Sequence, residues 1–226
     1  MSWYRAELIS GNEQLRLLLG DSPTKEEIKD YFSTEDFIHP LPVHLSSLNH
    51  HPLIKNAFRH VSPIPATQAR FLRYKPEGTF TSGLYMASDR VTALRERLNH
   101  ILTGNGMLAI TLFVYDLDYL PNLSKNIFDI ETRDIKDKSI LYHKTDYISC
   151  NNLFDQIAID QTTRKPNFNV VDYVSVRNPP QKNNLVYDIR LLGAKATNVT
   201  PYQVLQNNRN VIVSDVTGNL LFQFSI

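Results

Sequence analysis

Five of the seven histidines lie within residues 38–66 and are the first residues whose type could build a chemical site. Imidazoles bind zinc when their spacing lets them converge, for example at positions i and i+4 of a helix. This stretch also holds five of the twelve prolines, which resist both a helix and a central strand, and no cluster of acids accompanies it. We therefore expect no metal site at these histidines, which are His39, His44, His50, His51 and His60.

Cys150 is the only cysteine, and a lone thiol can serve as a nucleophile when a neighbouring base activates it. No local catalytic motif surrounds Cys150, so we do not expect it to react. A single cysteine allows neither an intramolecular disulfide nor a cluster of thiolate zinc ligands, which fits a protein made in a reducing cytoplasm. We expect no metal cofactor.

Composition and missing motifs exclude further classes. The 24 lysines and arginines against 23 aspartates and glutamates leave a net charge of +1, so we expect no nucleic-acid platform and no binding to acidic membranes. The first residues lack the basic and apolar segments of a secretory signal, and the longest apolar run, from Met107 to Tyr115, is too short to span a bilayer. We expect a cytoplasmic protein. No dinucleotide fingerprint, phosphate loop, His-Glu-x-x-His or Gly-x-Ser-x-Gly motif occurs.

The elements that must position a site form an α+β pattern. Patterning predicts strands over residues 3–9, 79–87, 107–115, 170–176, 185–192, 210–216 and 220–224, and helices over residues 22–32, 88–101 and 151–163. The near-continuous apolar run 107–115 predicts a central strand buried on both faces. Thr217-Gly218-Asn219 predicts a turn, so the chain ends in a hairpin. No repeat or linker divides the 226 residues, which favours one domain, with residues 38–66 as a long ordered excursion.

The predicted helix 88–101 places a carboxylate opposite its apolar face. Ser88 or Asp89 can cap it, and Gly104 and Gly106 end it. At 100° per residue, Glu96 lies roughly 140° from Val91 and so points away from the apolar stripe. A glutamate in this place is either a solvated surface residue or part of a cleft wall. The stripe consists of Val91, Leu94, Leu98 and Ile101.

The segment from Ala69 to Leu98 resembles the central block of RES-domain proteins, a bacterial toxin family named for an arginine, a glutamate and a serine. In that family an arginine precedes a turn, a tyrosine ends the strand after it, and a glutamate follows eleven residues later on a helix. Here Arg73 precedes a Pro-Glu-Gly turn at residues 76–78, Tyr85 stands twelve residues after Arg73, and Glu96 stands eleven after Tyr85.

Three other segments resemble the same family. They are the opening pair Tyr4-Arg5, the central strand Leu108 to Asp116 with its exit Leu120-Pro121, and the late strand Val171 to Val176, which carries Ser175 and continues into Asn183-Asn184-Leu185. The resemblance covers residues 3–9 and about 69–190, leaving 10–68 as an insertion and 191–226 as a C-terminal extension. Phe71-Leu72 replaces a Gly-Gly pair of the family, so Arg70 is an alternative to Arg73 as the site arginine.

The resemblance implies an ADP-ribosyltransferase-like mixed β core that takes NAD⁺ as its substrate, cleaves the nicotinamide–ribose bond and transfers ADP-ribose to phosphate or water. Glu96 is then expected to stabilise the charge that develops on the ribose, and Arg73 and Arg5 to hold the anionic diphosphate. Tyr85 is expected to be an aromatic wall or a hydroxyl partner, and Ser175 a hydrogen-bonding support. The resemblance also implies a protein partner, a small antitoxin that blocks the cleft.

Two other hypotheses stay open. The ADP-ribose acceptor could be a protein, which would make the chain a protein ADP-ribosyltransferase toxin. The chain could also be a catalytically inactive RES-like binding module. Another ADP-ribosyltransferase pattern, which needs Glu-x-Glu or Gln-x-Glu, is excluded because no glutamate in the chain has Glu or Gln two residues before it.

Overall fold

The computed structural model describes residues 2–8, 70–71, 84–102, 104–158, 167–187, 191–192 and 197–226. Several predictions fall outside these residues: the helix over 22–32, the stretch 38–66 with its five histidines, the turn 76–78, and Arg73. No helix among the described residues has the length and apolar content that a bilayer crossing needs.

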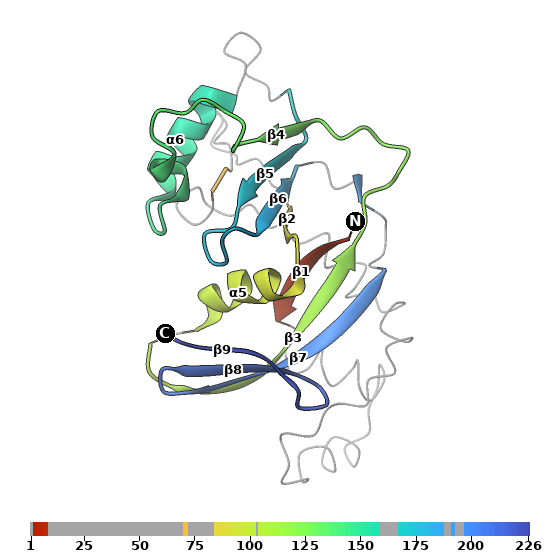
Figure 1. Ribbon diagram of the computed structural model, residues 1–226, viewed down its shortest axis with the longest axis vertical. Helices are drawn as coiled ribbons and strands as arrows, with labels where there is room; N and C mark the ends of the chain where they lie inside the picture. Colours follow the sequence, from red (N-terminus) through yellow and green to blue (C-terminus); the bar gives the residue numbers. More distant parts are fainter. Residues whose placement is uncertain are drawn as a thin grey trace, which may run out of the picture.

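The described chain forms one nine-stranded mixed sheet with two α-helices, which confirms the α+β class (Figure 1). Its elements are β1 (Trp3–Leu8), β2 (Leu84–Ala87), α5 (Arg90–Ile101), β3 (Met107–Leu117), β4 (Ile127–Asp129), the 3₁₀ helix η1 (Lys138–Tyr142), α6 (Tyr147–Ala158), β5 (Val170–Val174), β6 (Lys182–Val186), β7 (Asn198–Asn207), β8 (Asn210–Asp215) and β9 (Leu220–Ser225). The strand order is β4-β5-β6-β2-β1-β3-β7-β8-β9, and among these described strands only β4 and β5 pair in parallel.

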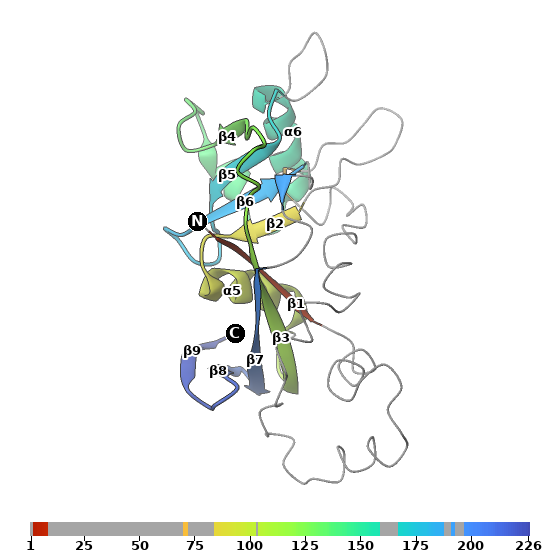
Figure 2. The same cartoon turned by 90° about the vertical axis from the view of Figure 1, so that its right-hand side faces the viewer.

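The sheet is narrowly joined between β1 and β2. These two strands pair at one position, Tyr4 with Ala87, whereas β1 pairs with β3 from Trp3–Leu117 to Leu8–Leu112. Helix α5 contacts β1, β2 and β3 at this place, and Figures 1 and 2 show it between the two parts of the sheet. A side-chain site can therefore form where the ladder is interrupted.

Helix α5 begins where the sequence predicted. The Asp89 carboxylate accepts a hydrogen bond from the Thr92 backbone N–H at 2.9 Å, which satisfies one of the free donors of the first turn. Leu94 and Leu98 are buried against β1 and β3, but Val91 is only half-buried. The helix ends at Leu102, an extended residue, so neither predicted glycine caps it.

Strand β3 is central, but it is not buried along its whole length. From Leu112 onward it lies between β1 and β7, and every residue from Leu112 to Leu117 is buried. Before Leu112, β7 is the only described strand that pairs with it, and Met107 is 86% exposed. The prediction of burial on both faces is therefore right for the part of β3 that pairs with β1 and wrong for the part before Leu112.

Helix α6 starts four residues before the predicted residue 151. The Asp146 carboxylate accepts from the Ser149 N–H at 3.0 Å and begins the helix. Its fully buried residues are Cys150, Asn151, Phe154 and Ala158, and Phe154 packs against Phe71 and Phe128. Leu153 and Ile157 are partly buried against the same core. The predicted residues 159–163 lie outside the described part.

The end of the chain forms the predicted hairpin, with β8 and β9 joined at Thr217-Gly218-Asn219, where Gly218 adopts a φ of 86°. Strand β7 was not predicted, although it pairs with β3 from Met107–Asn207 to Asp116–Asn198. Two shorter elements, β4 and η1, were also missed. The late strands β5 and β6 end before the predicted positions 176 and 192.

Candidate functional site

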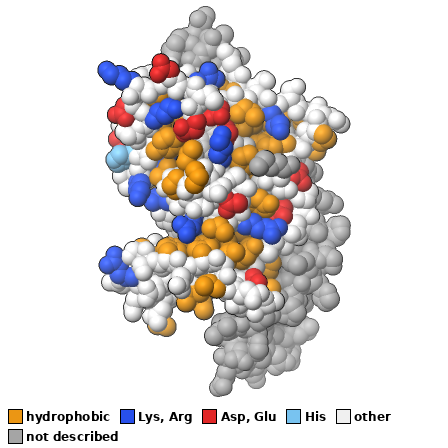
Figure 3. Space-filling view, viewed as in Figure 1, with side chains coloured by type: hydrophobic (Ala, Val, Ile, Leu, Met, Phe, Trp, Pro, Cys, Tyr) orange, Lys and Arg blue, Asp and Glu red, His pale blue; other side chains and the backbone are white. Residues whose placement is uncertain are grey.

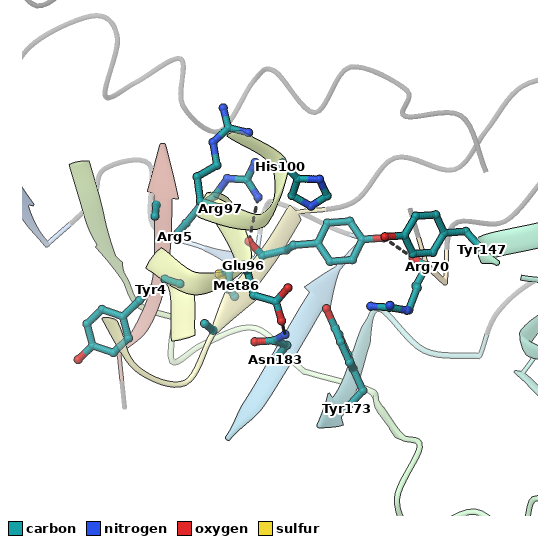
Figure 4. A pocket seen from close by; sticks show the side chains of 14 residues that line it. Tyr4, Arg5, Arg70, Met86, Glu96, Arg97, His100, Tyr147, Tyr173 and Asn183 are labelled. Atoms are coloured by element: carbon teal, nitrogen blue, oxygen red, sulfur yellow. Dashed lines mark hydrogen bonds between the residues drawn. The ribbon is translucent and has the colours of Figure 1, made fainter. Parts of the chain in front are cut away.

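A pocket of about 510 Å³ opens where β1 and β2 part, beneath helix α5 (Figure 4). This volume falls within the roughly 300 to 1,000 Å³ that is typical of small-molecule sites. Among the predicted site residues, Arg5, Tyr85 and Glu96 line it. The other lining residues are Tyr4, Ala6, Arg70, Met86, Ala87, Ala93, Arg97, His100, Tyr147, Tyr173 and Asn183.

The Glu96 carboxylate is held on one oxygen. Glu96 Oε1 accepts from Ser175 Oγ at 2.7 Å and from Asn183 Nδ2 at 2.8 Å. Figure 4 shows the Glu96 side chain directed at Asn183. Two donors on one oxygen fix the orientation of the carboxylate and leave Oε2 as the oxygen available for a ligand.

Ser175 does not face the pocket directly but lies behind Glu96. Its side chain is buried, and its Oγ accepts from the N–H groups of Arg177 at 3.2 Å and Asn178 at 3.1 Å. Because this oxygen already accepts two hydrogen bonds and donates its hydrogen to Glu96, the hydroxyl is fully engaged. Its place in the site is that of a support for the carboxylate.

A second contact ties the loop after β5 to α5. Asn178 Nδ2 donates to Thr92 Oγ1 at 2.7 Å, and Thr92 Oγ1 donates to Asp89 Oδ2 at the same distance. Thr92 is fully buried, so these hydrogen bonds are shielded from water. The loop that carries Ser175 is thus fixed to the helix that carries Glu96 at two points.

Arg5 bridges the interrupted sheet. Its Nη1 donates to the Tyr85 carbonyl oxygen at 2.9 Å, and its Nε lies 2.5 Å from Glu7 Oε1. Arg97 Nη2 reaches the other oxygen of Glu7 at 3.7 Å. Figure 4 shows Arg5 and Arg97 on the same side of the pocket.

Tyr85 contributes its ring to the pocket, while its hydroxyl is engaged elsewhere. The hydroxyl donates to the backbone carbonyl of Arg70, and burial raises the pKa of Tyr85 well above its usual range. Tyr85 is therefore neutral and an aromatic wall. Of the two roles expected for it, a hydroxyl partner for a ligand does not fit this arrangement.

Arg70 lines the pocket, whereas its alternative Arg73 lies outside the described residues. Arg70 Nε and Nη2 donate to the His143 carbonyl at 3.2 and 2.7 Å. Its guanidinium lies 5.1 Å from the centre of the Tyr147 ring, within cation–π range. These contacts hold the positive charge of Arg70 at the pocket lining.

The pocket is rich in cations. Among the described lining residues, three arginines, at positions 5, 70 and 97, stand against the one carboxylate of Glu96, which suits an anionic ligand. Partial desolvation and the nearby Arg97 guanidinium lower the pKa of His100, so this imidazole is neutral near pH 7. On the face shown in Figure 3, by contrast, basic, acidic and hydrophobic side chains are interspersed and no single basic patch forms.

Cys150 lies apart from the pocket lining. It is buried between α6 and the aromatic cluster, its Sγ donates to the Leu141 carbonyl at 3.4 Å, and burial raises its pKa to about 11. Within the described residues, no group of three or more histidines, cysteines and acids is arranged to hold a metal ion.

Asn183 is the site residue that the sequence did not single out. In the sequence it appears only as part of the Asn183-Asn184-Leu185 segment of the resemblance. Two neighbouring asparagines in a strand that is otherwise buried could have indicated it, because buried amides need hydrogen-bond partners. Comparison with known proteins adds nothing to this picture, since no family model and no curated protein matches the chain.

Proposed function

We propose that the protein cleaves the nicotinamide–ribose bond of NAD⁺ and transfers ADP-ribose to phosphate or water. The observation that carries the proposal is the Glu96 carboxylate, held through one oxygen by Ser175 and Asn183 in a pocket with three arginines. The identity of the substrate comes from the resemblance to RES-domain proteins, of which Arg5, Tyr85, Glu96 and Ser175 are the matched residues that lie in or against this pocket.

The chemistry asks little of the protein. The ring nitrogen of nicotinamide takes the electron pair of the bond to C1′ and leaves as a neutral group, so no strong acid is needed. Positive charge then develops on the ribose, as in glycoside cleavage, and the Glu96 carboxylate stabilises it. When water forms the new bond to C1′, its oxygen loses a proton to solvent. Phosphate forms this bond through an unprotonated oxygen, so no proton leaves the attacking atom.

The remaining residues position the substrate. Arginine forks bind diphosphate oxygens through paired N–H groups, which is the role proposed for Arg5, while Arg70 adds positive charge to the pocket lining. Tyr85 limits the pocket as a flat wall. We also propose a small antitoxin protein as a partner that blocks this pocket, so that expression of the chain alone harms a bacterial host.

The test is release of nicotinamide from NAD⁺ by the purified full chain, measured by chromatography with and without phosphate. Glu96→Gln keeps the acceptor for Ser175 and Asn183 but removes the charge, and we expect it to lower the rate about 100-fold or more. The matched control is Glu131→Gln, which changes an acid that pairs with Lys138 outside the pocket, and we expect this variant to keep full activity. Full activity of Glu96→Gln, or no nicotinamide from the wild type, contradicts the proposal. Label on an added protein instead of free ADP-ribose would favour the transferase alternative.

A further inference from the structure

One carboxylate, that of Glu7, joins two of the arginines that line the pocket. Arg5 Nε lies 2.5 Å from Glu7 Oε1, and Arg97 Nη2 lies 3.7 Å from Glu7 Oε2. Both arginines line the pocket, whereas Glu7 does not. We propose that Arg5 and Arg97 are the diphosphate-binding pair of the pocket and that Glu7 is an internal anion that competes with the ligand for them.

The fold explains why these three side chains meet. Arg5 and Glu7 stand two residues apart on β1 and therefore point to the same side of the strand. Arg97 comes from α5, which packs on β1, and it follows Glu96 directly in the chain. A ligand bound by Arg5 and Arg97 thus lies next to the carboxylate that faces the ribose in the proposed reaction.

Both guanidinium groups keep donors for a ligand. Each carries five N–H hydrogens, and Glu7 with the Tyr85 carbonyl uses only part of those of Arg5. The Nε of Arg97 is buried and has no hydrogen-bond partner among the described residues. A buried donor without a partner is unfavourable, so an anion at this place would satisfy it.

The Glu7 ion pairs are exchangeable. The side chains of Arg5, Glu7 and Arg97 are 24, 22 and 34% exposed, so solvent screens both pairs. A diphosphate offers more negative charge and more acceptor oxygens than one carboxylate and can replace Glu7 at these donors. The choice of a diphosphate as the ligand class rests on the proposed function, while the competition by Glu7 rests on the ion pairs.

The experiment is titration calorimetry of the full chain with inorganic pyrophosphate at low ionic strength. Glu7→Gln keeps an amide oxygen for Arg5 and removes the competing charge, so we expect the dissociation constant to fall about threefold to tenfold. Adding Arg97→Gln to this variant should reverse the gain. Glu131→Gln removes the same charge outside the pocket and should leave the affinity unchanged.

Three results would overturn the proposal. The first is unchanged or weaker binding by Glu7→Gln, which would mean that Glu7 orients Arg5 instead of competing. The second is that neither the wild type nor Glu7→Gln binds pyrophosphate. The third is that Glu7→Gln keeps its gain in affinity after Arg97→Gln is added. Melting temperatures show whether Glu7→Gln folds, and Glu7→Asp, whose shorter side chain retracts from Arg97, tests the same expectation if it does not. Nicotinamide release is measured separately on the same samples, so its absence would count only against the proposed function.

Discussion

Ser175 and Glu96 are 79 positions apart in the chain, and the hydroxyl of one donates to the carboxylate of the other over 2.7 Å. Ser175 lies in the loop after β5, and Glu96 lies on α5 beside the parting strands β1 and β2. The resemblance in the sequence had linked these residues only by order and spacing. Their contact is the most specific feature of the pocket, and it leads directly to the first prediction.

Ser175→Ala removes one of the two donors to Glu96 Oε1 and frees two backbone N–H groups from their acceptor. Loss of one charge-assisted hydrogen bond of about 1.5 to 3 kcal/mol predicts a fall in kcat for nicotinamide release of roughly 10-fold to 100-fold. Ser139→Ala, which also removes a hydroxyl bound to a carboxylate but at an exposed turn, is the control. Equal kcat for Ser175→Ala and wild type would rule out the supporting role.

Two variants of Asn183 show whether it orients the Glu96 carboxylate or only fills space. Asn183→Ala removes the second donor to Glu96 and should lower kcat about 10-fold. Asn183→Asp keeps the size of the side chain but brings a second carboxylate to Glu96, so we expect a larger loss despite the smaller change in shape. Steady-state kinetics of both variants check the order, and a milder effect of Asp than of Ala would favour mere packing.

Asp89→Ala tests the start of α5. The carboxylate accepts from the Thr92 N–H and from its hydroxyl, so its loss should lower the free energy of unfolding by about 1 kcal/mol. Urea denaturation followed by circular dichroism measures this change. Asp137→Ala at the exposed start of η1 is the comparison and should cost less. Unchanged stability of Asp89→Ala would show that the cap does not support the helix.

Buried tyrosines predict a loss of stability at alkaline pH. Burial raises the pKa values of Tyr85, Tyr173 and Tyr187 well above their usual range, so the folded protein keeps these protons while the unfolded chain loses them above about pH 10. The free energy of unfolding is therefore unaffected by them below pH 10 and falls above it, by about 1.4 kcal/mol per pH unit for each such tyrosine. Urea unfolding between pH 8 and 11 measures the slope. A flat profile would contradict the assignment, and Tyr85→Phe should make the slope shallower.

Much of the fold could be predicted because its signals are local. Asp89 is an N-cap within one turn of the helix it starts, and Gly218 marks a turn that needs positive φ. Strand β7 gave no such signal, because its burial depends on ten pairings with β3, more than 80 residues earlier. The start of α6 at Tyr147 and the partners of its Phe154 also lacked a local signal, since Phe71 and Phe128 come from distant segments.

The site divides in the same way. The helical spacing predicted that Glu96 would point away from the apolar stripe, and it does. No helical wheel could show that Asn183 would meet Glu96 from a strand 87 residues later, or that the Tyr85 hydroxyl would be taken by the Arg70 carbonyl. Both contacts depend on where the strands stand in the sheet, and periodicity carries no information about that.

Because β1 and β2 pair at one position, the residues of this pocket also connect the two parts of the sheet. Arg5 donates to the Tyr85 carbonyl, and Ser175 and Asn183 donate to Glu96. These side-chain hydrogen bonds add connections where the backbone ladder between β1 and β2 is short. We therefore expect a substitution of these residues that alters ligand binding to weaken the connection between the two parts of the sheet as well. A new ligand specificity at this pocket would then need further substitutions that restore the connection between the two parts of the sheet.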